Sequence, residues 1–220
     1  FDEDQSGVVF KDILALEDGK FAVFTDHFGQ QNADNEISVD HEFRIFDRTG
    51  VAISPTLSFK SDSTSGSAWT VDCKLTERGN FIALVNSRDS DFSNILEETL
   101  TLYIFDREGK LEHRCIIPKM IPAEPGLRED ITHQRISFMP DGGWIVTWNE
   151  GGNYDNNGTS NSFYFLRFDE DGNTLGEVGI IVAPEPYING QICPYDYFIT
   201  ALSSGGFVAT WAQVDIDRDD

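Results

Sequence analysis

The stretch Met139–Glu150 reads MPDGGWIVTWNE, and a second stretch, Ser203–Gln213, reads SSGGFVATWAQ. Both join a Gly-Gly turn signal to a short run of aromatic and β-branched residues, which is typical of a β-hairpin. Leu16–Thr25 and Thr76–Val85 are weaker copies of the same pattern. The chain therefore contains an internal repeat, and this repeat decides the fold class.

The period of the repeat is about sixty residues, and two independent anchors give it. The turn glycines are 60, 63 and 63 residues apart: Gly19, Gly79, Gly142 and Gly205. A second motif, FDRTG, FDREG and FDEDG, places Phe46, Phe105 and Phe168 59 and 63 residues apart. Each repeat thus predicts two hairpins, and four short strands in this length are typical of a β-propeller blade.

The apolar pattern of the central strands predicts that the repeats stack on one another. WIVTW and FVATW are apolar or Thr at every position, without the alternation of a strand that has one face in water. We therefore expect an all-β fold, a β-propeller of four-stranded blades. A two-sheet sandwich is the alternative, although it would leave one face of these strands polar.

The repeat register predicts the domain organisation. We expect one repeat domain in which whole blades are flanked by partial ones: 1–11 partial, 12–72, 73–134 and 135–197 whole, and 198–220 partial. This pattern suggests a partial excerpt of a larger ring or array. The alternative is a four-bladed ring in which Val8–Lys11 closes the last blade.

The net charge of the chain limits the classes of partner that it can bind. It has 38 acidic and 16 basic residues and a formal net charge of −22. Such an excess repels nucleic acid and anionic lipid, and it favours cations or a basic partner, although it also serves solubility alone. Apolar runs stay far below the ~20 residues that span a bilayer. We therefore expect no nucleic acid partner and no membrane insertion.

The motifs resemble a known class of repeat. The pattern GG[FW]xVxW followed by RFDxxG, best matched by Gly142–Trp148 and Arg167–Gly172, resembles repeats of large secreted or surface-attached bacterial proteins. Copies one and two match less well, because Thr25 and Val85 replace the second Trp. The resemblance implies a propeller-like fold and an extracellular or cell-surface location, and it implies no catalytic residues.

Acidic loops after the second strand of each repeat point to calcium. These loops are rich in Asp and Asn, and repeat symmetry predicts that they meet at one rim. Ca²⁺ takes about six to eight oxygen ligands, which such side chains supply. The candidate metal ligands are Asp215, Asp217 and Asp219, which alternate along the chain, and the shorter pair Asp89 and Asp91. The alternative is that Asp and Asn simply favour turns.

Cysteine and histidine residues give no recognisable site. Their spacing fits no zinc pattern. Cys73 aligns with Ile13, Ile136 and Ile199, so we expect it to be a buried apolar residue. The four histidines fall at unrelated repeat positions, and we expect solvated loop or strand-edge side chains.

We therefore expect an extracellular or cell-surface module with a binding, adhesion or structural role rather than an enzyme. Its partner would be a glycan, a protein, or other copies of the chain in an assembly. Candidate ligand-binding residues are the loop aromatics Tyr154, Phe28 and Phe92, which suit stacking on sugar rings, although packing against the rim is the alternative. Two other functions stay open: an architectural subunit of an extracellular filament or sheath, and a propeller hydrolase or lyase acting on polysaccharide. Glu150, Tyr154 and Arg128 are possible polar groups for the latter.

Overall fold

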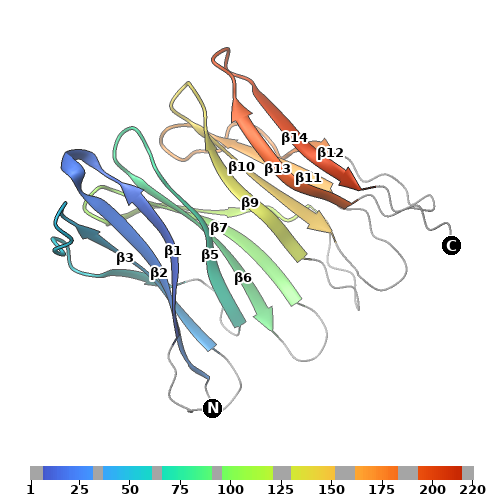
Figure 1. The fold of residues 1–220 in the computed structure, drawn as a ribbon. Helices are drawn as coiled ribbons and strands as arrows, with labels where there is room; N and C mark the ends of the chain where they lie inside the picture. Colours follow the sequence, from blue (N-terminus) through green and yellow to red (C-terminus); the bar gives the residue numbers. More distant parts are fainter. Residues whose placement is uncertain are drawn as a thin grey trace. The chain divides into compact units, whose positions relative to one another are not determined.

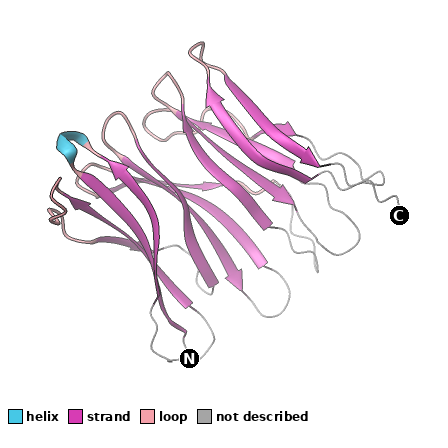
Figure 2. Ribbon diagram, viewed as in Figure 1, coloured by secondary structure: helices cyan, strands magenta, loops and turns pink. Residues whose placement is uncertain are grey.

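The computed structural model describes residues 7–31, 37–60, 66–90, 96–120, 130–151, 162–182 and 193–214 of the chain. Across these ranges the protein is all-β, as predicted, and its one helix is a single 3-10 turn, Glu17–Gly19 (Figures 1 and 2). The strands are β1 (Gly7–Ala15), β2 (Phe21–Gln31), β3 (Ile37–Phe46), β4 (Leu57–Lys60), β5 (Gly66–Leu75), β6 (Phe81–Ser90), β7 (Leu96–Phe105), β8 (Leu111–Ile117), β9 (Asp130–Phe138), β10 (Trp144–Gly151), β11 (Ser162–Phe168), β12 (Gly179–Val182), β13 (Cys193–Ala201) and β14 (Phe207–Val214).

The strands pair in chain order into repeated antiparallel sheets. Three sheets have four strands each, β1–β4, β5–β8 and β9–β12, and a further described sheet pairs β13 with β14. Two hairpins in succession account for each four-stranded sheet, which confirms the repeat unit expected from the sequence. The chain divides into two compact units, Phe1–Ile117 with the first two sheets and Pro118–Asp220 with the others.

In the first unit, the two sheets pack face to face around an aromatic core. Ala22, Phe24 and Phe43 of the first sheet are buried against the second sheet, which supplies Ala68, Cys73, Phe81, Ala83, Val85, Tyr103 and Phe105. The Phe43 ring lies 5.1 Å from that of Phe81 and 5.4 Å from that of Phe105. Burying each large side chain contributes about 1.5–3 kcal/mol. We call this covered face of the first sheet its back face, and the covered face of the second sheet its front face.

In the second unit, β10 has all eight residues buried, which confirms the two-sided burial predicted from WIVTW. The rings of Trp144 and Phe168 stack at 6.0 Å, and Phe207 of β14 meets Phe165 of β11 edge-on at 5.1 Å. The same prediction for FVATW is wrong, because Val208 and Trp211 are exposed. Val208 lies on the face opposite Phe207, and among the described residues of this unit no sheet follows β13–β14 to cover that face.

The turn glycines stand where the register placed them, and they adopt a conformation that other residues avoid. All four have φ between +73° and +90°, in the left-handed region that glycine enters without steric cost: Gly19, Gly79, Gly142 and Gly205. In the second turns an aspartate closes the backbone. Asp47 Oδ1 accepts hydrogen bonds from the backbone N–H groups of Thr49 and Val51 at 2.8 and 3.0 Å. These bonds give Asp47 a structural role in the turn.

The first strand differs from the predicted blade boundary. Residues 1–11 were expected to belong to a separate partial blade, with Val8–Lys11 as its fourth strand. Instead, β1 runs without a break from Gly7 to Ala15, and Val8 and Phe10 pair with His27 and Thr25 of β2. A bulge between Phe10 and Asp12 lets the strand continue through the polar residues Lys11 and Asp12. The polar residues in the sequence therefore do not mark the end of a strand.

The second glycine of the Gly-Gly turn provides a test of this packing. A Cβ on Gly143 would collide with the backbone carbonyl oxygen of Phe168, whereas one on Gly206, its counterpart in the next repeat, would meet only the end of Leu202 at 4.0 Å. We expect Gly143→Ala to destabilise the second unit by about 1–3 kcal/mol, because a backbone neighbour must move. Gly206→Ala should stay within about 0.5 kcal/mol of wild type.

Urea unfolding followed by tryptophan fluorescence measures this difference, since Trp144, Trp148 and Trp211 all lie in the second unit. Equal urea midpoints for Gly143→Ala and Gly206→Ala would contradict the close contact between Gly143 and the backbone carbonyl of Phe168. Lys20 and Asn80 occupy the same repeat position in the first unit, so the turn itself accepts a side chain.

Candidate functional site

A buried polar cluster joins the two sheets of the first unit. Asp26 of β2 lies opposite His41 of β3, and its Oδ1 is 2.7 Å from His41 Nδ1. Thr70 of β5 donates its backbone N–H to Asp26 Oδ2 and its hydroxyl to Asp26 Oδ1, both at 2.8 Å. Lys11 Nζ of β1 lies 3.0 Å from Asp26 Oδ2. We call these four residues the inter-sheet polar cluster.

The electrostatics of the cluster favour a charged Asp26. Burial of this carboxyl raises its pKa. The hydrogen bond and charge of His41 and the two hydrogen bonds of Thr70 together lower it by more, so the pKa of Asp26 lies below the ordinary value. The Asp26 and His41 side chains are 0% and 1% exposed, so water competes little with these contacts.

The geometry of the cluster suits attachment between sheets rather than nucleophilic catalysis. The Thr70 hydroxyl lies 3.1 Å from His41 Nδ1, the nitrogen that already faces Asp26. In a nucleophile–base–acid relay the hydroxyl would instead contact the other ring nitrogen. That nitrogen, Nε2, is buried and has no hydrogen-bond partner among the described residues, and the His41 ring lies 5.1 Å from the Phe59 ring. The cluster therefore holds Thr70 of one sheet to Asp26 and His41 of the other.

Sequence reasoning missed this cluster, and the reason is a strand boundary. Asp26 directly follows the repeat segment Leu16–Thr25, where the sequence predicts an acidic loop, but β2 continues to Gln31 and Asp26 is fully buried. His41, predicted to be a solvated loop or strand-edge side chain, is also buried. The repeat register contained a signal: Asn86 and Asn149 occupy the Asp26 position in the next two repeats, and both are buried. Each of the three four-stranded sheets therefore has a buried polar residue at this repeat position.

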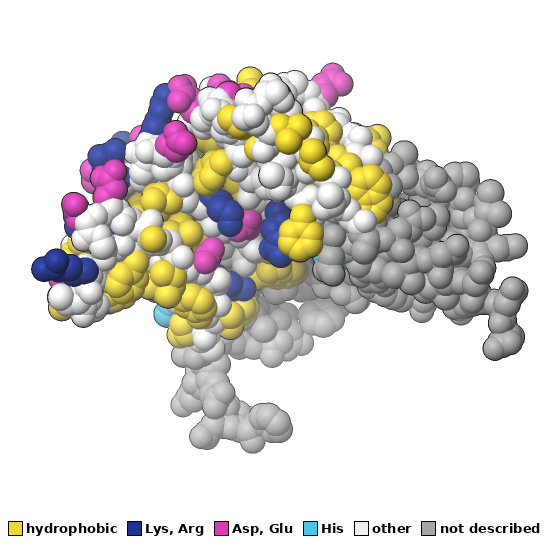
Figure 3. Space-filling view, turned by 45° about the horizontal axis from the view of Figure 1, so that its top comes forward, with side chains coloured by type: hydrophobic (Ala, Val, Ile, Leu, Met, Phe, Trp, Pro, Cys, Tyr) yellow, Lys and Arg dark blue, Asp and Glu magenta, His cyan; other side chains and the backbone are white. Residues whose placement is uncertain are grey.

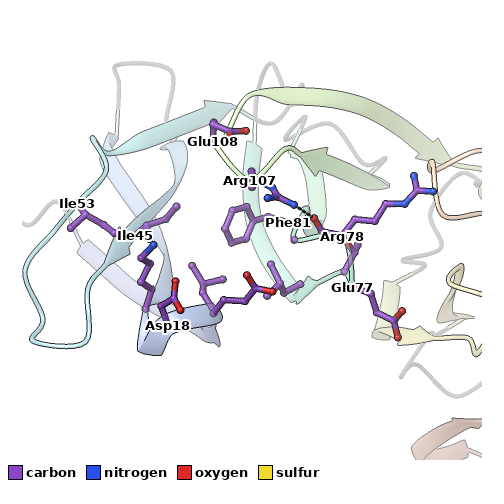
Figure 4. A pocket seen from close by; sticks show the side chains of 14 residues that line it. Asp18, Ile45, Ile53, Glu77, Arg78, Phe81, Arg107 and Glu108 are labelled. Carbon is purple, nitrogen blue, oxygen red and sulfur yellow. Dashed lines mark hydrogen bonds between the residues drawn. The ribbon is translucent and has the colours of Figure 1, made fainter.

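A cleft of about 310 Å³ opens between the two sheets of the first unit, at the end that carries the short turns (Figure 4). Its lining comes from both repeats: Leu16, Glu17, Asp18, Lys20, Ile45, Ile53, Leu75, Thr76, Glu77, Arg78, Gly79, Phe81, Arg107 and Glu108. Arg107 of the second sheet donates a hydrogen bond from its guanidinium to the backbone carbonyl of Arg78 at 2.7 Å. This bond joins two turns of one sheet beside the cleft. We call this opening the turn-end cleft.

The turn-end cleft has an apolar interior and a charged edge. Phe81 belongs to the aromatic core and is buried, whereas Glu17, Asp18 and Arg107 lie on exposed turns. Charges of both signs stand among apolar side chains on the face drawn in Figure 3. Binding sites commonly combine an apolar surface with a few polar groups that fix orientation. The cleft therefore suits a ligand that presents both an apolar face and hydroxyl or carboxylate groups.

The predicted metal ligands are not brought together among the described residues. Asp215, Asp217, Asp219 and Asp91 lie outside those residues, and Asp89 is placed only through its backbone in β6, opposite Gly66 and Glu97. In the part of the chain that the structure describes, no group of three or more His, Cys, Asp or Glu side chains is arranged to hold a metal ion.

Of the three aromatic residues predicted to bind a ligand, the structure describes Phe28. Phe92 and Tyr154 lie outside the described residues. Phe28 lies in β2 rather than in a loop, and it is half-buried against the aromatic core. Its surroundings match the packing alternative. Cys73 is fully buried in β5, as its alignment with isoleucine residues in the other repeats predicted.

Glu150, one of the possible hydrolase residues, is a buried strand residue. Its carboxylate accepts a hydrogen bond from Trp148 Nε1 at 2.7 Å and from the backbone N–H of Met120 at 2.9 Å. It is 1% exposed, and both donors belong to the second unit. Tyr154 and Arg128 lie outside the described residues. Glu150 thus anchors the segment around Met120 to β10.

Comparison with protein-family models gave no match, and comparison with curated proteins gave none either. Among the described residues, no helix has the length and apolar character needed to cross a membrane. The fold of the described residues defines the class of protein: it is an all-β protein of repeated antiparallel sheets.

Proposed function

We propose that the chain is a non-catalytic β-propeller-like binding module of a secreted or cell-surface protein, and that its partner is a glycan or another protein. Face-to-face packing of two repeats in the first unit supports the propeller arrangement, because propeller blades stack in this way around an axis. Such stacking brings turns of neighbouring repeats together at a rim, where binding residues commonly lie.

The observation that carries the binding role is the turn-end cleft. It exists only because two repeats pack side by side, and each contributes apolar and charged side chains. A sugar ring has an apolar face and a polar edge, which fits this combination. The best-connected titratable groups, Asp26 and His41, are engaged with each other and with Thr70 inside the sheets, which favours binding over catalysis.

We further propose that calcium stabilises the module through the acidic loops. The support is the sequence pattern of Asp215, Asp217 and Asp219, together with Asp89 and Asp91, in a chain with a formal net charge of −22. Clustered carboxylates repel one another, and a hard divalent cation relieves that repulsion.

A glycan array with two single-residue variants tests the proposal. We expect wild-type protein to retain a subset of glycans. Arg107→Ala probes the turn-end cleft, and Tyr154→Ala probes the loop aromatic that the sequence predicts to stack on sugar rings. If the cleft is the site, Arg107→Ala should weaken retention about tenfold or more while Tyr154→Ala leaves it unchanged. Retention that neither variant alters, or no retention of any glycan, would count against the glycan proposal.

Thermal unfolding in millimolar Ca²⁺ and in chelator tests the metal. We expect the melting temperature to rise by several degrees with Ca²⁺, because an ion bound only by the folded state shifts the unfolding equilibrium. An unchanged transition in both buffers would remove calcium from the proposal without affecting the cleft.

A further inference from the structure

One face of the first sheet is exposed among the described residues; it is apolar over β1 and part of β2, and its β3 part carries Asp40, Glu42 and Arg44. Residues directly opposite one another across antiparallel strands share a face, so Phe10 and Ile13 of β1 lie on the same side as Thr25 and Val23 of β2. Phe10 and Ile13 are 57% and 53% exposed. The face also includes Val8 and the stacked rings of Phe21 and Phe46, 5.3 Å apart. This is the front face of the first sheet, since it lies opposite the covered back face.

The repeat register identifies what such a face normally contacts. The counterparts of Phe10, Ile13, Phe21, Val23 and Phe46 in the second sheet are Thr70, Cys73, Phe81, Ala83 and Phe105. All of these are buried in the first unit. Phe81 and Phe105 pack on Phe43, and Thr70 bonds Asp26, all through the back face of the first sheet. A front face in this repeat is thus a surface that receives the back face of a preceding sheet.

The last sheet carries the complementary surface. Its front face contacts β11 through Phe207, which packs on Phe165, while Trp211 farther along the same face is 42% exposed. Its back face is uncovered among the described residues: Phe198 of β13 is 69% exposed and Val208 of β14 is 45% exposed. Val208 and Thr210 stand at the repeat positions of Ala22 and Phe24, which are two of the residues that cover the second sheet in the first unit.

We propose that the back face of the β13–β14 sheet of one copy of this chain docks on the front face of the β1–β4 sheet of a second copy. The contact repeats the sheet-on-sheet junction already present in the first unit, with Val208 and Thr210 replacing Ala22 and Phe24. Exposed apolar patches of this kind mark interaction sites. The two surfaces differ, so the contact is head-to-tail and generates a ring or a filament.

This inference is independent of glycan binding, because it uses sheet faces rather than the turn-end cleft. Analytical ultracentrifugation from low micromolar to several hundred micromolar protein measures it. We expect the average mass of wild-type protein to rise with concentration. Ile13→Asp on the front face and Phe198→Asp on the back face should each weaken association at least about tenfold, because either places a charge in the contact. Ile116→Asp, at an equally exposed apolar residue of β8, should associate as wild type does.

Mixing the two variants gives the decisive result. Ile13→Asp keeps an intact back face and Phe198→Asp keeps an intact front face, so the mixture should form a dimer and nothing larger. Each variant alone should stay a monomer, with far-UV circular dichroism as the check that it is folded. A wild-type chain that is monomeric at every concentration overturns the proposal, as does a mixture that fails to dimerise. Variants that change the hydrodynamic radius of a monomer without changing its mass would point to closure within one chain, and would also overturn it.

Discussion

Trp148→Ala is expected to destabilise the second unit by about 3–5 kcal/mol, enough to abolish much of the stability of a domain this small. The Trp148 side chain is fully buried in β10, and its ring stacks on Tyr164 with the centroids 5.9 Å apart. Removal of the indole leaves a cavity, and the neighbouring side chains can fill it only if they move. It also takes away the indole N–H that Glu150 accepts at 2.7 Å inside the protein.

The repeat supplies a matched control. Trp211 occupies the Trp148 position in the next repeat, 63 residues later, and it is 42% exposed. Trp211→Ala should therefore lower the stability by no more than about 1 kcal/mol. Differential scanning calorimetry of both variants separates the two effects. Equal losses would mean that the motif residue acts in the same way in every repeat, contrary to the burial seen here.

Asp26→Ala should destabilise the first unit by about 3–5 kcal/mol at neutral pH. The substitution leaves the Lys11 ammonium, the His41 ring and the Thr70 N–H without the carboxylate that they share. Asp26→Asn should cost less, about 1–3 kcal/mol, because an amide oxygen still accepts a hydrogen bond. Asparagine is the residue at this position in the next two repeats, Asn86 and Asn149.

The pH dependence of these variants has a definite sign. The pKa of Asp26 is lowered in the folded protein, so its contribution to stability is present above the ordinary pKa of an aspartate and is lost as the pH falls through the lowered value. The gap in melting temperature between wild type and Asp26→Asn should therefore shrink as the pH is taken well below 4. Hydrogen exchange of the first-unit strands in the same series shows whether the loss is confined to that unit. A gap that stays constant with pH would mean that the charge of Asp26 does not hold the sheets together.

Much of the fold followed from the sequence, because its signals are local. The glycines at positions 19, 79, 142 and 205 marked hairpin turns, and each has the positive φ that only glycine adopts readily. Pairing of β3 with β4 across Asp47–Gly50 also agreed with the expected second hairpin. The site was harder to predict: Asp26 and His41 belong to a cluster completed by Thr70, which lies 44 residues from Asp26 in the chain. Nothing local to Asp26 distinguishes a loop aspartate from a buried one.

The sequence by itself determined an all-β repeat of about sixty residues with turns at the recurring glycines, since turn chemistry and strand propensity depend on neighbours in the chain. Only the tertiary structure decided which copies of the motif are covered. Ile145 and Val208 occupy the same repeat position, three residues after the turn glycine, yet Ile145 is buried and Val208 is exposed. The physical reason is that a strand buries both faces only where a sheet lies on each side of it, and the residues that make the neighbouring sheet lie elsewhere in the chain.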